Sequence, residues 1–312
     1  MVLGRCGVYA MTLCAAIDIG SNTTRLLVAE PVEGQLKKVM EQRAYTRIGK
    51  AVDGKGRISA EKVGEVGEVV ATQVRLAQEL GAEEIRAVAT AAVRDARNCE
   101  EVAEAVGAAA GVTIEVLPEE EEGRLSFLGA TKTLGHPAEG LIGVVDIGGG
   151  STEVILGTVT DGVQSVQSWP VGSGNLADEL LSSDPPSAAE IRRTRDRIDD
   201  IFEGVEIEPP AQAVAVGGSA TSLRRLVGAV LEYETLERGI RVLCGDPAAD
   251  VGRRFELDPT RVRILPTGVL LLEKLSDLLG QPLQIGKGGL REGVILDLLN
   301  GSINGSPERV AA

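Results

Sequence analysis

The sequence predicts an α/β protein built from two duplicated domains that face each other across a central cleft. The first observation is an Asp-Ile-Gly stretch that occurs twice, at Asp18 to Arg25 and at Asp146 to Glu153. The second is that both copies lie between apolar runs and are followed by a further extended run, which predicts three strands in each half. The third is the length of 312 residues, which is enough for two ordinary domains.

The second copy is typical of a strand, a tight glycine-rich turn and another strand, with the sequence Asp146-Ile147-Gly148-Gly149-Gly150-Ser151-Thr152-Glu153. Three consecutive glycines leave no side chain at the bend, so backbone N–H groups can close around a phosphate. Asp146 ends the strand, where a carboxylate can hold a divalent cation. Taken alone, the stretch fits a glycine-rich hairpin with a capping Asp equally well.

The first copy aligns with the second residue for residue, as Asp18-Ile19-Gly20-Ser21-Asn22-Thr23-Thr24-Arg25. The match continues, because Leu26 to Val28 aligns with Val154 to Leu156, and the hairpin signal Glu33-Gly34 aligns with Asp161-Gly162. A repeat with a period near half the chain indicates duplicated domains and not a solenoid. Two such turns facing each other predict a clamp for phosphate groups.

Composition limits the class of protein. Hydrophobic residues make up 43% of the chain and aromatic residues only 2%, so the core must consist of Val, Ile, Leu and Ala. The net charge of −14 argues against general nucleic-acid binding. No apolar run approaches the ~20 residues of a membrane span. The cysteines show no Cys-x-x-Cys pairing, which predicts neither a metal site nor a disulfide framework and fits a reducing, cytoplasmic compartment.

The N-terminal stretch and the single histidine carry little functional signal. Residues 1–16 are mildly apolar, but a cleaved signal peptide would remove or abut the first core strand, so we reject one. Met11 is an alternative start. His136 lies in an expected linker before Pro137, and its isolation excludes a site built from several histidines.

The first half alternates strands and helices in the order βββαβαβα. The expected strands are 14–19, 24–30, 36–46, 85–90 and 112–117, and the expected helices are 59–80 and 100–109. This order is the half-domain of an actin-like (ribonuclease H-like) fold, although a fold alone does not define a function. A polar turn at Thr90 to Arg97 contains Arg94.

Four consecutive glutamates, Glu119 to Glu122, follow Pro118 and open a helix that runs to about Thr133. Carboxylates in a first helical turn stabilise the positive end of the helix dipole, and this structural role is sufficient for Glu119 to Glu121. A carboxylate at the domain junction, facing two phosphate loops, can also act as a general base on water. We place the domain boundary here, with domains at 1–133 and 134–312.

The second half repeats the three strands at 141–147, 152–158 and 163–170. A strongly charged, basic helix is expected at 187–203. A short strand then ends in a third glycine-rich turn, Gly217-Gly218-Ser219-Ala220-Thr221, ahead of a helix that begins near Thr221, an arrangement suited to anions. A final helix at 293–300 is expected to pack back on the first domain, followed by a disordered tail from Gly301.

Taken together and in order, these motifs resemble the exopolyphosphatase and guanosine pentaphosphate phosphohydrolase family. The motifs are the two Asp-Ile-Gly loops, the four-Glu helix start, Gly-Gly-Ser-Ala-Thr and Gly-Leu-Arg-Glu-Gly at 289–293. The resemblance covers residues 14 to about 300 and is to the short, two-domain form. It implies a hydrolase that removes the terminal phosphate of inorganic polyphosphate or guanosine pentaphosphate with Mg²⁺ and water. It also implies a homodimer.

The resemblance assigns roles to individual residues. Glu122 corresponds to the catalytic glutamate of the family and Glu153 to its second important glutamate. Asp146 corresponds to the metal-holding aspartate, and Arg94 to the arginine that grips phosphate. For a basic path along which a polyanion reaches the site, the candidates are Lys287, Arg291 and the helix carrying Arg192 to Arg197. Most other arginines are expected on solvated helix faces.

The sequence departs from the family pattern at one place, and two other functions compete with the hydrolase interpretation. The family often has Gly-x-Val-Arg-Leu after the second hairpin, whereas here the stretch Val171 to Leu176 has no Arg, which affects the expected chain length and affinity. An actin-like ATPase or sugar kinase would share the loops. A non-enzymatic sensor of guanosine tetra- or pentaphosphate would not need both Glu122 and Glu153.

Overall fold

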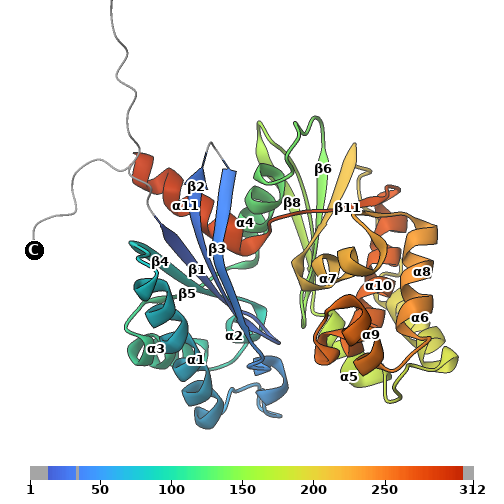
Figure 1. Ribbon diagram of the computed structural model, residues 1–312, viewed down its shortest axis with the longest axis horizontal. Coiled ribbons are helices and arrows are strands. Elements are labelled where there is room, and N and C mark those ends of the chain that lie inside the picture. Colours follow the sequence, from blue (N-terminus) through green and yellow to red (C-terminus); the bar gives the residue numbers. More distant parts are fainter. Residues whose placement is uncertain (1–12, 33–34, 305–312) are drawn as a thin grey trace, which may run out of the picture.

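Two α/β units lie side by side in the computed structural model, which describes residues 13–32 and 35–304 (Figure 1). The first contains, in chain order, β1 (Cys14–Ile19), β2 (Thr24–Val32), β3 (Gln35–Ala44), the 3₁₀ helix η1 (Ile48–Ala51), α1 (Ala60–Glu79), β4 (Glu84–Ala89), α2 (Ala91–Arg94), α3 (Cys99–Ala110), β5 (Ile114–Val116) and α4 (Glu119–Lys132). The expected Glu33-Gly34 turn, a start at Met11 and the tail beyond residue 304 fall outside the described residues.

The remainder of the chain forms the second unit and a final helix. It contains, in chain order, β6 (Ile142–Ile147), β7 (Thr152–Thr158), β8 (Gly162–Trp169), α5 (Ser173–Leu180), α6 (Ala188–Ile201), β9 (Gln212–Val216), α7 (Gly217–Val227), β10 (Val230–Leu231), α8 (Tyr233–Leu243), α9 (Ala248–Phe255), α10 (Pro259–Leu279), β11 (Leu283–Ile285) and α11 (Leu290–Asn304). None of the helices in the described ranges is long and apolar enough to cross a membrane.

The two sheets share one strand arrangement. The first has the order β3-β2-β1-β4-β5 and the second β10-β11-β9-β6-β7-β8. In the first sheet, the central strand β1 pairs antiparallel with β2 and parallel with β4. In the second sheet, the central strand β6 pairs antiparallel with β7 and parallel with β9 in the same way. The prediction of two duplicated α/β units of the actin-like (ribonuclease H-like) type is therefore confirmed.

Helices cover both faces of each sheet. Alternate residues of a strand point to opposite faces, so Ile17 of β1 packs with α1 and α3, whereas Ala16 packs with α4 and α11. In the second unit, α5 to α8 and α10 cover one face, and Phe127 of α4 packs on the other. Helix α4 therefore belongs to the core of both units, and α11 returns to the first sheet through Val294 and Ile295.

The local boundaries differ from expectation at two functional segments. Helix α7 begins at Gly217 and not near Thr221, because Gly217 adopts a φ of 83° and turns the chain directly from β9 into the helix. Helix α11 extends from Leu290 to Asn304, well beyond the expected 293–300, so the backbone at 301–304 is helical and not a disordered tail. Glu292 accepts a hydrogen bond from the Gly289 N–H at 2.9 Å and caps this earlier start.

Helices α4 and α11 cross at glycines that allow backbone-to-backbone contact. A Cβ added at Gly129 would overlap the carbonyl oxygen of Gly289, and one added at Gly293 would overlap the carbonyl oxygen of Leu125. Because the obstacle is backbone and not a flexible side chain, the helices would have to move apart to admit a methyl group.

We expect Gly129→Ala to lower the free energy of unfolding by about 1–3 kcal/mol, the usual cost of overpacking a close contact. The matched control is Gly64→Ala on α1, where nothing lies within 4 Å of the added Cβ. There the substitution should stabilise by roughly 0.5–1 kcal/mol because alanine is the better helix former. Urea unfolding of both variants measures this difference, and an equal response of the two would contradict the assigned contact.

Candidate active site

The two Asp-Ile-Gly loops form the same turn in each unit and touch each other. The Gly20 N–H donates to Thr23 O at 3.1 Å, and the Gly148 N–H donates to Ser151 O at 3.0 Å. A Cβ added at Gly149 would lie 2.6 Å from the Asn22 Cβ. Because glycine has no side chain, the two loops can approach each other closely from the two units.

A cavity of about 430 Å³ lies beside these loops between the two units. Most of the predicted residues line it, namely Gly20, Ser21, Asn22, Glu122, Asp146, Gly148, Gly149, Ser151, Glu153, Gly217 and Gly218. Arg94 and Gly150 instead line a second cavity, which the same loops border on another side. Ser219 lines neither cavity, because its buried hydroxyl donates to the Ser173 hydroxyl at 3.2 Å.

Carboxyl groups from both units converge at the loop end of the cavity. The exposed fraction of Glu122 is 9% and that of Glu153 is 5%. Burial is the main cause that raises the pKa of Glu122 to about 7; Arg94 opposes the rise, and Asp18 and Asp146 contribute to it. Burial and the carboxyl of Glu122 also raise the pKa of Glu153 well above its usual range. A carboxylate with a pKa near neutrality is suited to take up a proton in a reaction.

Glu122 is held by Arg94 at the start of α4. The Arg94 Nη1 donates to Glu122 Oε2 at 2.6 Å and to Leu117 O at 3.1 Å, so the guanidinium joins the end of β5 to the first turn of α4. Glu119 lies 3.7 Å from the same guanidinium. Arg94 can thus orient the Glu122 carboxylate while its remaining N–H groups are available to an anion.

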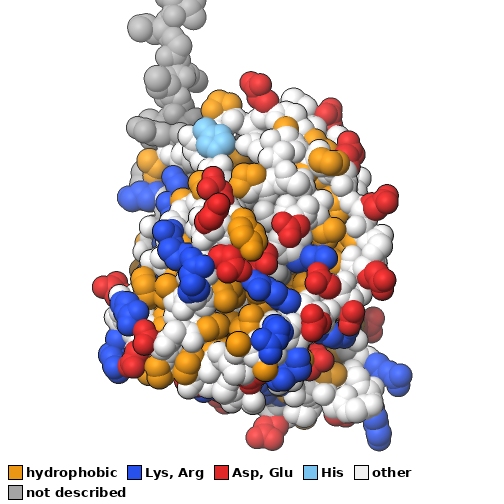
Figure 2. Space-filling view, turned by 90° about the vertical axis from the view of Figure 1, so that its right-hand side faces the viewer, with side chains coloured by type: hydrophobic (Ala, Val, Ile, Leu, Met, Phe, Trp, Pro, Cys, Tyr) orange, Lys and Arg blue, Asp and Glu red, His pale blue; other side chains and the backbone are white. Residues whose placement is uncertain are grey.

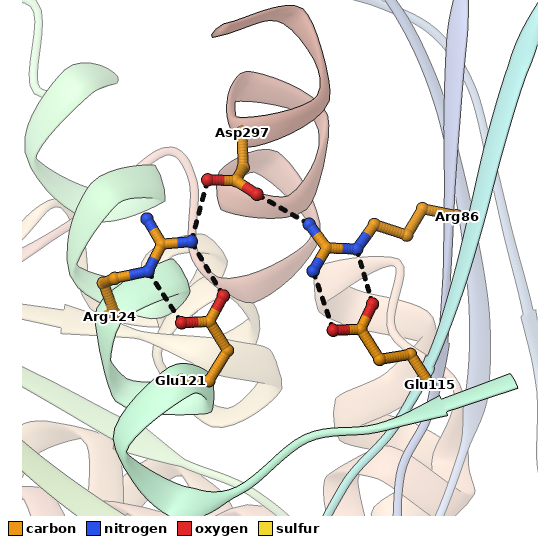
Figure 3. Close-up of polar contacts among 5 residues, drawn as sticks. All are labelled: Arg86, Glu115, Glu121, Arg124 and Asp297. Atoms are coloured by element: carbon orange, nitrogen blue, oxygen red, sulfur yellow. Dashed lines mark hydrogen bonds and ion pairs between the residues drawn. The ribbon is translucent and has the colours of Figure 1, made fainter. Parts of the chain in front are cut away.

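A network of ion pairs holds the same turn of α4 from the other side (Figure 3). Arg124 makes two hydrogen bonds with Glu121, both of 2.7 Å, and its Nη2 also lies 2.8 Å from Asp297 of α11. Asp297 also accepts from Arg86 of β4 at 2.7 Å, and Arg86 makes two further bonds with Glu115 of β5. Glu121 therefore anchors α4 to the first unit, while its neighbour Glu122 faces the cavity.

Arginines line the cavity away from the carboxyl groups. A Cβ added at Gly218 would overlap the guanidinium groups of both Arg25 and Arg261, so both lie across this glycine. Arg261 is only 4% exposed, and its buried Nε has no hydrogen-bond partner among the described residues. Burial and neighbouring arginines lower the pKa of Arg25 to about 9 and of Arg261 to about 10. A buried guanidinium without an ion-pair partner in the described part of the chain, such as that of Arg261, indicates an anion-binding site.

The basic residues that line the cavity differ in part from those expected along the path of a polyanion. Lys287 and Arg291 do line the cavity, together with Arg25, Lys38, Arg43, Arg225 and Arg261. The α6 helix does not line it, because Arg195 pairs with Glu237 and Glu273, and Arg197 lies near Glu179. On the outer face of the second unit, Lys and Arg side chains are interspersed with Asp and Glu and form no continuous basic patch (Figure 2).

Asp18 and Asp146 provide a site that fits Mg²⁺. The buried Oδ1 of Asp18 has no hydrogen-bond partner among the described residues, and Asp146 Oδ2 accepts only from Ser126 at 3.1 Å. Burial raises the pKa of both groups, that of Asp146 to about 6. In the described ranges, no three His, Cys, Asp or Glu side chains are grouped to hold a metal by themselves. Mg²⁺ commonly takes one or two carboxylates and completes its shell with phosphate oxygens and water.

Comparisons with known proteins agree with these features. The model of the Ppx/GppA phosphatase family matches residues 27–301. The chain belongs to this family. It is 30% identical over 313 residues to exopolyphosphatase 2 of Mycobacterium tuberculosis, an alignment that covers 92% of this chain and 97% of the relative. It is 32% identical over 308 residues to exopolyphosphatase 1 of Mycobacterium bovis, covering 93% of this chain and 89% of that protein.

Solved structures of Ppx/GppA proteins share the fold. The crystal structure of the Aquifex aeolicus family member superposes with a TM-score of 0.78 at 30% identity, covering 95% of this chain and 100% of that one. An exopolyphosphatase from Cytophaga hutchinsonii superposes with a TM-score of 0.80 at 21% identity, covering 93% and 98% of the two chains. The second likeness concerns the fold alone.

We expect Arg94→Gln to move the acidic limb of the pH profile of kcat/KM upward by about one unit, at the low end of the effect of removing a nearby opposite charge. If Glu122 acts as a general base, it must be deprotonated to act, and activity then falls as the pH drops through the pKa of Glu122. Arg94 lowers that pKa against burial, and its loss leaves burial unopposed. Arg97→Gln, on the exposed Arg97 of the same segment, is the control. A limb that stays in place or moves to lower pH would contradict the assignment.

Proposed function

We propose that this Ppx/GppA protein is an exopolyphosphatase that hydrolyses the terminal phosphoanhydride bond of inorganic polyphosphate. The observation that carries the proposal is the buried Glu122, with a pKa raised to about 7, held by Arg94 beside two glycine-rich loops and next to an arginine-lined cavity. The names of the mycobacterial relatives support the same activity.

The residues suggest how the reaction proceeds. The backbone N–H groups of Ser21 and Asn22 in the first loop and of Gly149 to Ser151 in the second hold the terminal phosphate. The Glu122 carboxylate accepts a proton from a water molecule whose oxygen attacks the terminal phosphorus. The bridging P–O bond breaks, and its oxygen leaves with the shortened chain while orthophosphate is formed. Mg²⁺, held by Asp18 and Asp146, would neutralise the developing charge on the phosphate oxygens.

The cavity favours an inorganic chain over guanosine pentaphosphate. Its lining consists mainly of charged and polar side chains and glycines, and none of its lining residues in the described ranges is aromatic. Nucleotide bases are usually bound against apolar or aromatic surfaces, which would be needed beside the phosphate groups. Guanosine pentaphosphate hydrolysis therefore stands as the alternative function. The cytoplasmic location and the homodimer remain predictions.

A substrate panel tests this proposal. Phosphate release is measured with Mg²⁺ from polyphosphates of defined lengths, guanosine pentaphosphate and ATP, and each reaction is repeated with EDTA. We expect release from polyphosphate that depends on Mg²⁺. Preferential release from guanosine pentaphosphate would replace the proposal by the alternative, and release from ATP alone would indicate an actin-like ATPase.

We expect Glu122→Gln to lower kcat on polyphosphate by about 10²–10⁴-fold, the usual contribution of a positioned general base. The amide keeps the size of the side chain but cannot accept the proton from water. Glu120→Gln is the matched control, because Glu120 lies in the same helical turn and is exposed. Circular dichroism and thermal unfolding establish that both variants fold. Unchanged turnover of folded Glu122→Gln would exclude Glu122 as the base.

A further inference from the structure

Strand β3 presents three charged side chains, Arg43, Glu41 and Lys38, to the cavity of about 430 Å³ beside the phosphate loops. Arg43 lies opposite Arg25 at the loop end of β2, and Glu41 and Lys38 follow along the strand, away from the loop. A bulge at Val39 brings Lys38 to the same face of the sheet as the other two. The row along β3 is therefore cation, anion and cation.

Glu41 joins this row to the start of α11. Its Oε1 accepts a hydrogen bond from Arg291 Nη2 at 2.8 Å, and its Oε2 accepts one from Lys38 Nζ at 3.1 Å. Burial raises the pKa of Glu41, but Arg291 and Lys38 outweigh burial and lower the pKa to about 2. Glu41 is therefore ionised at neutral pH and occupies two of the cationic groups that line the cavity.

The other carboxyl groups of the lining have different surroundings. Three of them, among the described residues, lie apart from the carboxyl groups at the loop end. Asp258 accepts from the Thr260 N–H at 2.7 Å and caps α10, and Glu292 caps α11 through the Gly289 N–H. The side chain of Glu256 is 90% exposed. Glu41 differs from these, because both of its partners are cationic side chains of the cavity itself.

We propose that Glu41 is a specificity-determining residue, which competes with the phosphate chain for Arg291 and Lys38 and thereby weakens the binding of long chains. This inference rests on the proposed exopolyphosphatase activity. A chain that extends from the loops along the β3 row meets Arg43 first and Glu41 next. To bind the two cations, the phosphates must displace the carboxylate, which then stays beside them as a like charge.

The position of Glu41 makes this competition depend on chain length. Alternate residues on one face of a strand lie about 6.6 Å apart, so Glu41 lies about that far beyond Arg43 along β3. A triphosphate held at the loops fills the loop end of the cavity, whereas a longer chain extends further along the row. Glu41 should therefore oppose the binding of long chains more than the binding of triphosphate.

Removing the charge of Glu41 tests the proposal. We expect Glu41→Gln to lower KM for long polyphosphate by about fivefold, the effect of one unit charge a few ångströms away under strong solvent screening. We expect kcat to change less than about twofold, and the gain on triphosphate to be smaller. An unchanged or raised KM for long chains would overturn the proposal. An equal gain on triphosphate would also contradict it, because local competition predicts a difference.

Two further variants separate competition from a structural role of the ion pair. Glu41→Asp keeps the negative charge in the cavity and should not lower KM. Glu30→Gln removes a carboxylate that pairs with Lys37 at 2.7 Å on the same sheet, and neither residue lines the cavity, so this variant should behave as wild type. If Glu41 only anchors β3 to α11, Glu41→Gln will lower the thermal stability without lowering KM.

Direct binding distinguishes failure of this proposal from failure of the proposed activity. The dissociation constant of long polyphosphate is measured by titration calorimetry for Glu122→Gln and for the double variant with Glu41→Gln, because turnover is slow in this background. We expect the double variant to bind about fivefold more tightly. Equal or absent binding would overturn the competition. If the wild type released no phosphate from polyphosphate, the proposed activity would fail, while tighter binding by the double variant would still support Glu41 as the competitor.

Discussion

The site depends on an electrostatic constraint, because several carboxyl groups are crowded at one end of a buried cavity. Burial is the largest cause that raises the pKa of Asp18, Glu122, Asp146 and Glu153, and neighbouring carboxyl groups add to the rise for each. A buried cluster of carboxylates is energetically unfavourable unless nearby cations or bound protons offset its negative charge. Arg94 offsets the charge on Glu122, and Arg25 offsets that on Asp18 and Asp146. The negative charge of these carboxyl groups that the arginines do not compensate can hold a cation and accept a proton.

Duplication of one unit explains the shape of the site, because both units supply the same glycine-rich loop. The residue that lies opposite the loop aspartate differs between the two units, and this difference explains the chemistry of the site. In the first sheet Asp18 lies opposite Arg25, and in the second Asp146 lies opposite Glu153. The two aspartates are equivalent and meet across the cleft. Their partners have opposite charge, so the first unit supplies a cation for an anionic chain and the second a buried carboxylate. A symmetrical pair of loops thereby forms an asymmetrical site.

The parts of the site that could be predicted from the sequence are local in the chain. Each glycine loop is a continuous motif, and Glu122 follows Pro118 at a helix start. The arginine cluster could not be predicted, because Arg261 of α10 reaches the cavity only through its tertiary contact with Gly218. By helical pattern it resembles Arg195 of α6, which pairs with Glu237 and Glu273 instead. The ion pairs of Asp297 join residues far apart in sequence and carry no local signal either.

The arginine cluster would also explain how a chain with a net charge of −14 binds the polyanion proposed as its substrate. Burial and repulsion from neighbouring arginines lower the pKa of Arg25 and Arg261, so the folded protein holds both cations at a free-energy cost. Both remain charged at neutral pH, since their pKa values of about 9 and about 10 lie above it. An anion in the cavity relieves this repulsion, and part of the binding free energy therefore comes from strain already present in the fold. Local cationic groups, and not the net charge, then decide what binds.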